Sequence, residues 1–293
     1  MIARLAILLL LCWSIPAAAA DLRVLVVQSD SSPLYQTFAK TYAGNLPASV
    51  KLTVLERAED FNGETADLIV TVGVKAADWV AGRSAQPQLA AMIPSNFEPT
   101  VKHNRRLAAI YLDQPWSRQV SLLRAALPER NRIGVLHSPG KDLSALRSEL
   151  VAHGDTLTAR TLRGGDTLFA DLEEVLSSSD VLLAIPDGAV YSSNTIRNIL
   201  LTSYRRSIPL VGFSQAYVRA GALYALFSTP EQLAAQAADA TLTFAQGRKL
   251  PEAQFPSLYT ISVNQEVART LGITIKSADA LRLQIEKSSG STR

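Results

Sequence analysis

The feature that most constrains the fold of this chain is an internal repeat of short apolar segments. Residues 23–29 (RVLVVQS) reappear as 132–138 (RIGVLHS), an offset of 109 from residue 23 to residue 132. Residues 67–73 (DLIVTVG) reappear as 180–186 (DVLLAIP), an offset of 113 from residue 67 to residue 180. Two further pairs follow in the same order, namely 91–95 with 210–214 and 110–115 with 225–230. Nearly unbroken apolar runs that end in a small or polar residue are typical of strands buried on both faces of a parallel sheet.

The segments between these runs carry helical patterns, so strands and helices alternate in both halves. Alternation of this kind requires right-handed crossovers and places helices on both faces of each sheet. The predicted fold class is therefore α/β, with two similar Rossmann-like lobes built on parallel sheets. We expect strands over 22–28, 50–55, 67–72, 88–93 and 107–112, then over 132–137, 156–162, 181–185, 209–212 and 223–227. We expect helices over 33–43, 75–81, 143–152, 168–176, 193–203 and 231–246.

The ends of two equivalent strands predict where the chain passes between the lobes. Asp113 and Ser228 both follow the last strand of a unit, so both positions predict crossings. The helix over 231–246 then returns to the first lobe, and the tail from residue 257 crosses once more. Three adjacent crossings form a hinge, and two facing sheet edges form a cleft. The predicted lobes comprise residues 21–113 plus 228–256, and residues 114–227 plus 257–293.

The first twenty residues have the pattern of a secretory signal peptide. Arg4 supplies the positive start, residues 5–11 the apolar core, and the alanines 18–20 a small-residue cleavage site. The only cysteine, Cys12, lies inside this segment and follows a leucine, where a lipoprotein needs a small residue. The mature chain then has no thiol for a disulfide or a cysteine metal site. We expect a soluble, exported product located in the periplasm.

Charge and motifs argue against nucleic-acid binding and catalysis. The net charge is +3, and Arg105-Arg106 and Arg205-Arg206 are isolated pairs rather than a basic stripe. Residues 212–216 (GFSQA) lack the closing glycine of a nucleophile elbow. His137 ends a strand at the expected cleft but has no base–nucleophile partner in the pattern. No metal-ligand spacing and no glycine-rich phosphate loop is present, so we predict no enzyme, no metal and no cofactor.

Four segments of the second half resemble a known family. They are 187–192 (DGAVYS), 208–214 (IPLVGFS), 218–223 (VRAGAL) and 263–275 (VNQEVARTLGITI). They resemble bacterial ABC-transporter substrate-binding proteins with a type I periplasmic-binding fold, in the group that includes tryptophan and tyrosine binders. The resemblance covers nearly the whole mature chain. It implies a small-molecule ligand, a monomer and an ABC permease as partner.

The first lobe departs from that family. Its members usually carry a Gly-Thr or Gly-Ser pair after the third strand, whereas Gly73 is followed here by Val74 and Lys75. The opening helix is also altered, to the residues SDSS at 29–32. Two interpretations stay open: the ligand differs, or binding has weakened in favour of another role.

Candidate ligand contacts lie where strands end and helices begin, because ligands of open α/β sheets sit outside the carboxyl ends of strands. Hydroxyl and N–H groups there suit a carboxylate, and Asp187 is suited to an ammonium group, so an amino acid or similar small carboxylate is expected. The first-lobe candidates are Ser29, Ser31, Ser32, Gly73, Val74, Ser95 and Asp113, and the second-lobe candidates are Ser138, Asp187, Tyr191, Ser192 and Ser214. Possible stacking walls are Tyr35, Phe97, Trp116, Tyr191 and Phe213.

Each candidate also has a structural interpretation. Ser31, Ser32 and Ser192 fit helix caps, and Asp113 fits a stabiliser of the hinge turn. Asp187 precedes a glycine and fits a turn, and aromatic residues are more often core than ligand platform. The function predicted from these patterns is a periplasmic solute-binding protein that captures a ligand between two lobes for an ABC importer. The alternative is a periplasmic sensor or adaptor that signals to a membrane receptor without transport, because one fold serves both.

Overall fold

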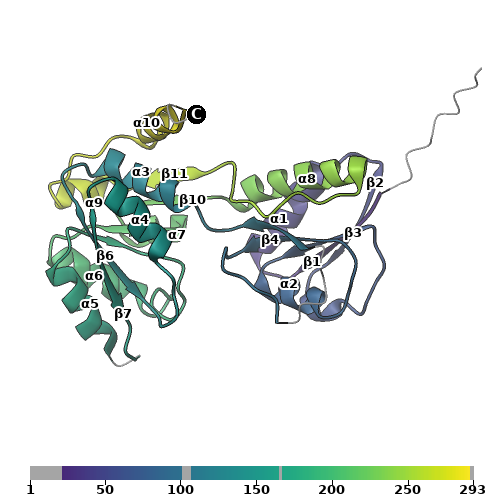
Figure 1. Cartoon of the computed structure of the whole chain (residues 1–293), viewed down its shortest axis with the longest axis horizontal. Helices are drawn as coiled ribbons and strands as arrows, with labels where there is room; N and C mark the ends of the chain where they lie inside the picture. Colours follow the sequence, from purple (N-terminus) through teal and green to yellow (C-terminus); the bar gives the residue numbers. More distant parts are fainter. Residues whose placement is uncertain (1–21, 101–106, 165–166, 291–293) are drawn as a thin grey trace, which may run out of the picture.

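The computed structural model describes residues 22–100, 107–164 and 167–290. Within them the chain forms two α/β lobes that lie side by side and are joined by segments of the chain that pass from one lobe to the other (Figure 1). The predicted signal peptide and the pair Arg105-Arg106 lie outside the described residues. None of the described helices is long and apolar enough to cross a lipid bilayer.

The first lobe is built on a five-stranded sheet with the order β2-β1-β3-β4-β5, in which every pair of neighbours is parallel. Its strands are β1 (Leu22–Gln28), β2 (Val50–Leu55), β3 (Leu68–Val72), β4 (Gln88–Ile93) and β5 (Leu107–Tyr111). β3 and β4 are buried along their whole length because helices cover both faces of the sheet. These are α1 (Pro33–Gly44), the short 3-10 helix η1 (Ala58–Asp60), α2 (Val74–Ala81) and α8 (Pro230–Gly247).

Alternate residues of β1 point into two separate cores of this lobe. Val24 and Val26 belong to the core under α1 and α8, whereas Leu25 and Val27 belong to the core under η1 and α2. Side chains of a strand alternate between faces, so an unbroken apolar run fills both cores at once. The apolar runs of the sequence are therefore explained by burial on both faces of the sheet.

The second lobe contains a six-stranded sheet with the order β11-β10-β9-β8-β6-β7. Its strands are β6 (Arg132–His137), β7 (Thr156–Thr161), β8 (Val181–Leu183), β9 (Leu210–Gly212), β10 (Tyr224–Phe227) and β11 (Thr260–Val263). β11 pairs antiparallel with β10, and the other pairs are parallel. The helices are α3 (Trp116–Ala126), α4 (Ser144–Ala152), α5 (Leu168–Ser177), α6 (Ile196–Arg205), α7 (Gln215–Ala220), α9 (Gln265–Thr270) and α10 (Ala278–Gly290).

The predicted repeat is present in the topology. Strands β1 to β5 and β6 to β10 follow the same spatial order, with the first strand of each set between the second and the third. The α/β fold with two similar lobes is thereby confirmed. The antiparallel strand β11 and the helices α3, α7, α9 and α10 were not predicted.

Helix α8 belongs to the first lobe although it follows the last parallel strand of the second. It packs beside α1 (Figure 1). There the Tyr42 hydroxyl lies 2.7 Å from the Thr241 hydroxyl, and both groups are buried. Thr229 forms a capping box with Gln232 at the start of α8. Ser32 also precedes a helix, but its hydroxyl caps nothing, and its N–H donates to Asp30 instead.

Candidate functional site

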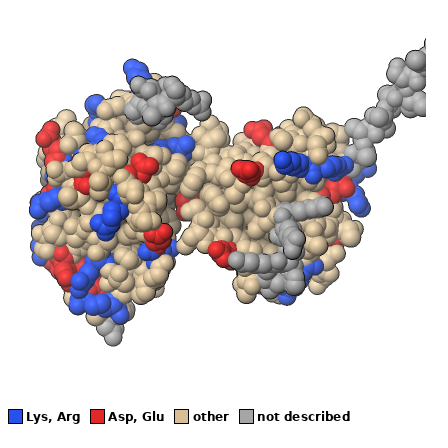
Figure 2. Space-filling model, viewed as in Figure 1, with Lys and Arg blue, Asp and Glu red and all other residues tan. Residues whose placement is uncertain are grey.

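The crossings between the lobes lie at the carboxyl ends of parallel strands in both sheets. The chain leaves the first lobe after β5 and leaves the second lobe after β10, in each case from the carboxyl end of a parallel strand. Since all parallel strands of a sheet end at one edge, the predicted site residues gather at the two edges next to the crossings. The molecular surface narrows between the two lobes (Figure 2). The candidate site is this inter-lobe region.

Ser29 holds the first-lobe edge together. Its hydroxyl donates to the carbonyl of Val72 at 2.9 Å and accepts the N–H of Ala76, at the start of α2, at 3.0 Å. The residue is only 4% exposed. Both hydrogen-bonding roles are thus filled from within the lobe, which joins β1 and β3 to α2.

Gly73 is the residue from which α2 begins, and two features require a glycine there. Its φ of 87° is left-handed, and a Cβ atom would lie 2.5 Å from the Tyr35 hydroxyl and 2.6 Å from the Ser29 hydroxyl. The structure thereby brings Ser29 and Gly73 together with Tyr35. Leu34 and Val74, at the starts of α1 and α2, are 49% and 45% exposed.

Ser95 and Asp113 form a pair at the far side of the same edge. The Asp113 carboxylate accepts both the N–H and the hydroxyl of Ser95 at 2.6 Å. The pair ties the segment after β4 to the segment after β5. Ser31 is exposed on the loop before α1, and its carbonyl accepts a hydrogen bond from the Gln36 side chain.

Asp187 is the organising residue of the second-lobe edge. It is 6% exposed, and its carboxylate accepts the N–H of Ser138 at 2.7 Å and the N–H of Ala189 at 3.1 Å. Burial acts to raise the pKa of Asp187, but these N–H donors outweigh it and hold the pKa below the ordinary carboxyl value. The ionised carboxylate therefore joins the end of β6 to the loop that follows β8.

An aromatic cluster lies beside Asp187. The ring of Phe213 is half-buried, 4.4 Å from the Tyr217 ring and 6.4 Å from the Tyr191 ring, centroid to centroid. Tyr191 is 5% exposed, and its carbonyl accepts the Tyr217 hydroxyl at 3.1 Å. The remaining candidates flank this cluster: Ser192 shares a hydrogen bond with Thr195, and Ser214 is the residue from which α7 begins.

The other predicted stacking walls pack inward. Trp116 is the first residue of α3 and packs against the core of the second lobe. Phe97 packs against a small core formed by Ala77, Ile93 and their neighbours in the first lobe. Both are half-buried, so the structure does not bring them into the group around Phe213.

A polar network joins the three crossings. Gln114 in the first crossing donates from Nε2 to the Ser228 hydroxyl in the second, and Ser228 donates to the carbonyl of Leu258 in the third, at 2.8 and 2.6 Å. Arg118 donates from one guanidinium nitrogen to the Gln114 side chain at 2.6 Å and to the carbonyl of Pro256 at 2.9 Å. Its guanidinium lies over the ring of Tyr259, 4.5 Å from the centroid.

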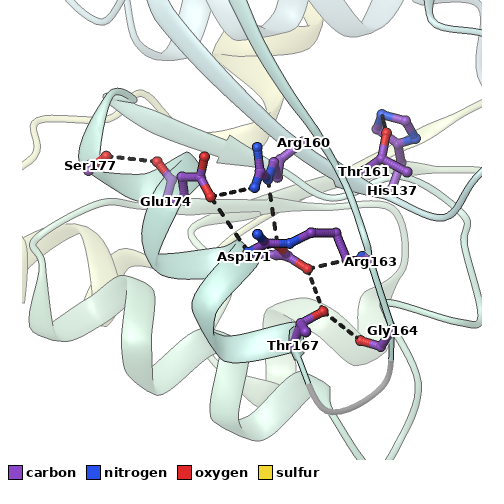
Figure 3. A network of polar contacts seen from close by, with 9 residues as sticks. All are labelled: His137, Arg160, Thr161, Arg163, Gly164, Thr167, Asp171, Glu174 and Ser177. Carbon is purple, nitrogen blue, oxygen red and sulfur yellow. Dashed lines mark hydrogen bonds and ion pairs between the residues drawn. The ribbon is translucent and has the colours of Figure 1, made fainter.

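An ion-pair cluster lies between the end of β7 and the start of α5 in the second lobe (Figure 3). Asp171 has no exposed surface and accepts the N–H and guanidinium of Arg163 and the hydroxyl of Thr167. Although burial acts to raise the pKa of Asp171, these donors hold it far below the ordinary carboxyl value. Arg160 bridges Asp171 and Glu174, so two arginines neutralise two carboxylates and hold the end of β7 and the chain after it on α5.

His137 lies at the end of β6, beside the end of β7. Its Nδ1 lies 2.8 Å from the carbonyl of Ser138, and its Nε2 lies 3.5 Å from the Thr161 hydroxyl (Figure 3). Among the residues that the structure describes, no group of three histidine, cysteine or acidic side chains could hold a metal ion. The arrangement is that of a strand end held in place by its neighbours.

Comparison with protein-family models decides the family. Residues 48–282 match the model of the family described as ABC transporter substrate binding protein. The chain belongs to this family. Curated proteins yielded no match.

Several solved structures share the fold of this family member. An ABC domain from Streptococcus pneumonia in complex with L-Trp has a TM-score of 0.64 and 18% identity, covering 88% of this chain and 96% of that one. A ligand-free, open substrate-binding protein with adhesive properties from Clostridium difficile has a TM-score of 0.67 and 14% identity, covering 87% and 96%. A XylFII–LytSN complex has a TM-score of 0.55 and 10% identity, covering 84% and 99%. These likenesses establish the type I periplasmic-binding fold.

Sequence analysis of this substrate-binding protein missed residues whose hydrogen-bond partners lie far away in the sequence. Gln114, Arg118 and Ser228 were not predicted to form a network, because no local pattern signals partners more than 100 positions apart. Tyr35 was considered only as a stacking wall, whereas its hydroxyl lies at the start of α2. Gly73 was the one available signal that the Tyr35 hydroxyl lies so close to the backbone at this position.

Proposed function

We propose that this protein is a periplasmic solute-binding protein that captures a small ligand between its lobes for an ABC importer. The observation that carries the proposal is the linked set of crossings beside the two strand-end edges, with Gln114, Ser228 and Arg118 at its centre. The signal peptide over residues 1–20 directs the chain to the periplasm. The lobes comprise residues 21–113 plus 228–256, and residues 114–227 plus 257–293.

The proposed mechanism is hinge closure around the ligand. Contacts from both lobes exist only in the closed state, so the ligand stabilises that state relative to the open one and shifts an existing equilibrium. The hydrogen bonds of Gln114 and Ser228 keep the crossings in register while the lobes move. The closed form then presents one continuous surface, with parts from both lobes, to the permease.

The proposed ligand is an amino acid or a similar small carboxylate. N–H groups at the start of α2 favour an acceptor, because the first turn of a helix leaves them without intrahelical partners. Asp187 is ionised and placed beside the aromatic cluster, which suits an ammonium group and an adjoining side chain. The L-Trp complex of a similar fold supports this ligand class.

A thermal-shift screen against amino acids, small carboxylates, sugars and polyols tests the proposal. A ligand at about a hundred times its dissociation constant stabilises the folded state by about 2.7 kcal/mol. Small-angle scattering with the hit should then show a smaller radius of gyration, as closure requires. A library without any stabilising compound contradicts the proposed function.

The alternative function is a periplasmic sensor or adaptor. It is supported by the replacement of the usual first-lobe hydroxyl by Val74 and by the likeness to a XylFII–LytSN complex. The neighbouring genes discriminate the two functions. A permease and an ATPase beside the gene favour uptake, whereas a receptor or kinase beside a lone copy favours sensing.

A further inference from the structure

The third crossing is bonded to a helix of each lobe through two neighbouring residues. The carbonyl of Pro256 accepts a hydrogen bond from the guanidinium of Arg118 on α3 at 2.9 Å. The N–H of Ser257 donates to the side-chain oxygen of Gln236 on α8 at 2.9 Å. Helix α3 packs in the core of the second lobe, whereas α8 packs in the core of the first. This part of the chain is therefore tied to both lobes at once.

Tyr259, the residue just before β11, is held by two helices of the second lobe. The guanidinium groups of Arg118 on α3 and Arg282 on α10 lie over its ring, 4.5 and 4.9 Å from the centroid. A cation over an aromatic face is attracted to it, and more strongly where water is excluded. Tyr259 is 8% exposed. The ring is thus fixed at the point where the third crossing enters the second lobe.

A second residue of α10 contacts the same tyrosine. Glu286 follows Arg282 by four positions, so the two side chains lie on one face of α10. Burial and then the charge of Glu286 raise the pKa of the Tyr259 phenol, and a hydrogen bond with Glu286 acts in the same direction, whereas the two arginines lower it. The phenol therefore keeps its proton at neutral pH and donates to the Glu286 carboxylate.

Helix α10 is anchored on the second lobe by other residues. Leu281 and Ile285 are 0% and 2% exposed and belong to the core of that lobe. The helix lies beside α3 (Figure 1). Leu283, the residue after Arg282, is 58% exposed. Helix α10 therefore connects the outer surface of the second lobe with the ring of Tyr259.

We propose that α10 restricts the relative motion of the two lobes, with Arg282 and Glu286 as positioning residues for Tyr259. This control of the hinge rests on the proposed function, to which it adds a regulatory contact. Motion of the lobes requires the backbone torsions of the crossing residues to change. While α10 holds the ring of Tyr259, bending of the third crossing is confined to the residues before it. Displacement of α10 from Tyr259 releases this restraint.

Backbone hydrogen exchange of the whole protein, followed by mass spectrometry without ligand, tests the restraint directly. In Arg282→Ala the segment 254–260 should exchange about two- to fivefold faster, the factor expected from one lost contact between a cation and a ring. Strand β3 in the first lobe should exchange at the wild-type rate, because a general loss of stability would speed up both segments. Arg269→Ala is the matched control, since it removes an arginine whose side chain is 72% exposed on α9. It should leave the segment 254–260 unchanged.

Distances between fluorophores on the two lobes, measured by single-molecule energy transfer without ligand, give the second test. Arg282→Ala should broaden the distribution of distances, whereas Leu283→Ala, at the exposed neighbouring position, should not. Tyr259→Leu should broaden it as well. Adding Arg282→Ala to Tyr259→Leu should broaden it no further, because both side chains act through one ring.

Three results overturn the proposal. They are wild-type exchange of the segment 254–260 in Arg282→Ala, a wild-type distribution of distances in that variant, and full additivity of its effect with that of Tyr259→Leu. If circular dichroism shows that Tyr259→Leu folds poorly, Glu286→Ala takes its place and must speed up exchange of the same segment. Neither measurement uses a ligand, so these failures leave the proposed function intact. A screen without any stabilising compound contradicts the proposed function alone.

Discussion

The side chain of Gln114 donates a hydrogen bond to the hydroxyl of Ser228 at 2.8 Å, across 114 positions of sequence. Each residue follows the last parallel strand of its own half, so this bond joins two equivalent crossings of the repeated fold. Ser228 in turn donates a hydrogen bond to the carbonyl of Leu258 in the third crossing. A single buried hydroxyl thereby holds all three crossings in register.

Replacing Ser228 by alanine should destabilise the protein. The change leaves the Gln114 amide and the Leu258 carbonyl without this partner in a region where Ser228 is only 6% exposed. An unsatisfied buried polar group costs about 1–3 kcal/mol. Urea unfolding should show a loss of that size, whereas Ser148→Ala, at an exposed position on α4, should show almost none. Equal stability of the two variants contradicts this account of the hinge.

Arg118→Lys should allow the two lobes a wider range of relative positions. A lysine keeps the charge but loses the planar guanidinium that bonds Gln114 and Pro256 and lies over Tyr259. We expect a broader distribution of distances between fluorophores placed on the two lobes, measured by single-molecule energy transfer without ligand. Arg197→Lys, on α6 away from the crossings, is the control and should keep the wild-type distribution.

The repeated sheets could be predicted from the sequence because buried parallel strands leave unbroken apolar runs, as in 23–29 and 132–138. The short antiparallel strand β11 leaves no such run, since it has four residues at a sheet edge. The polar residues that follow strands were also located from the sequence. Their roles were harder to predict: Ser29 and Asp187 have their hydrogen bonds filled within their own lobes, which depends on loops that fold back from elsewhere in the chain.

Asp187→Ala should lower stability at neutral pH, and the effect should fade in acid. The folded-state pKa of Asp187 lies below the ordinary value of 3.8, so the stability it contributes is present above that value. It is lost as the pH falls through the lower, folded-state pKa. At pH 7 we expect a loss of about 1–3 kcal/mol, because the N–H groups of Ser138 and Ala189 lose their acceptor. The difference in melting temperature between the two proteins should narrow as the pH falls below 3.8, and a constant difference from pH 7 into acid would contradict this assignment.

Gly73→Ala should damage both stability and ligand binding. The left-handed φ of 87° strains any residue with a Cβ atom, and that atom would meet the hydroxyls of Tyr35 and Ser29. A forced close contact of this kind costs about 1–3 kcal/mol. Gly44→Ala is the matched control, because a Cβ atom there meets nothing within 4 Å, and an alanine near the end of α1 should leave stability equal or slightly higher. Thermal unfolding measures the first effect, and calorimetry with a ligand found by the thermal-shift screen measures the second. A Gly73→Ala protein as stable as Gly44→Ala would show that Tyr35 and Ser29 do not enclose this position.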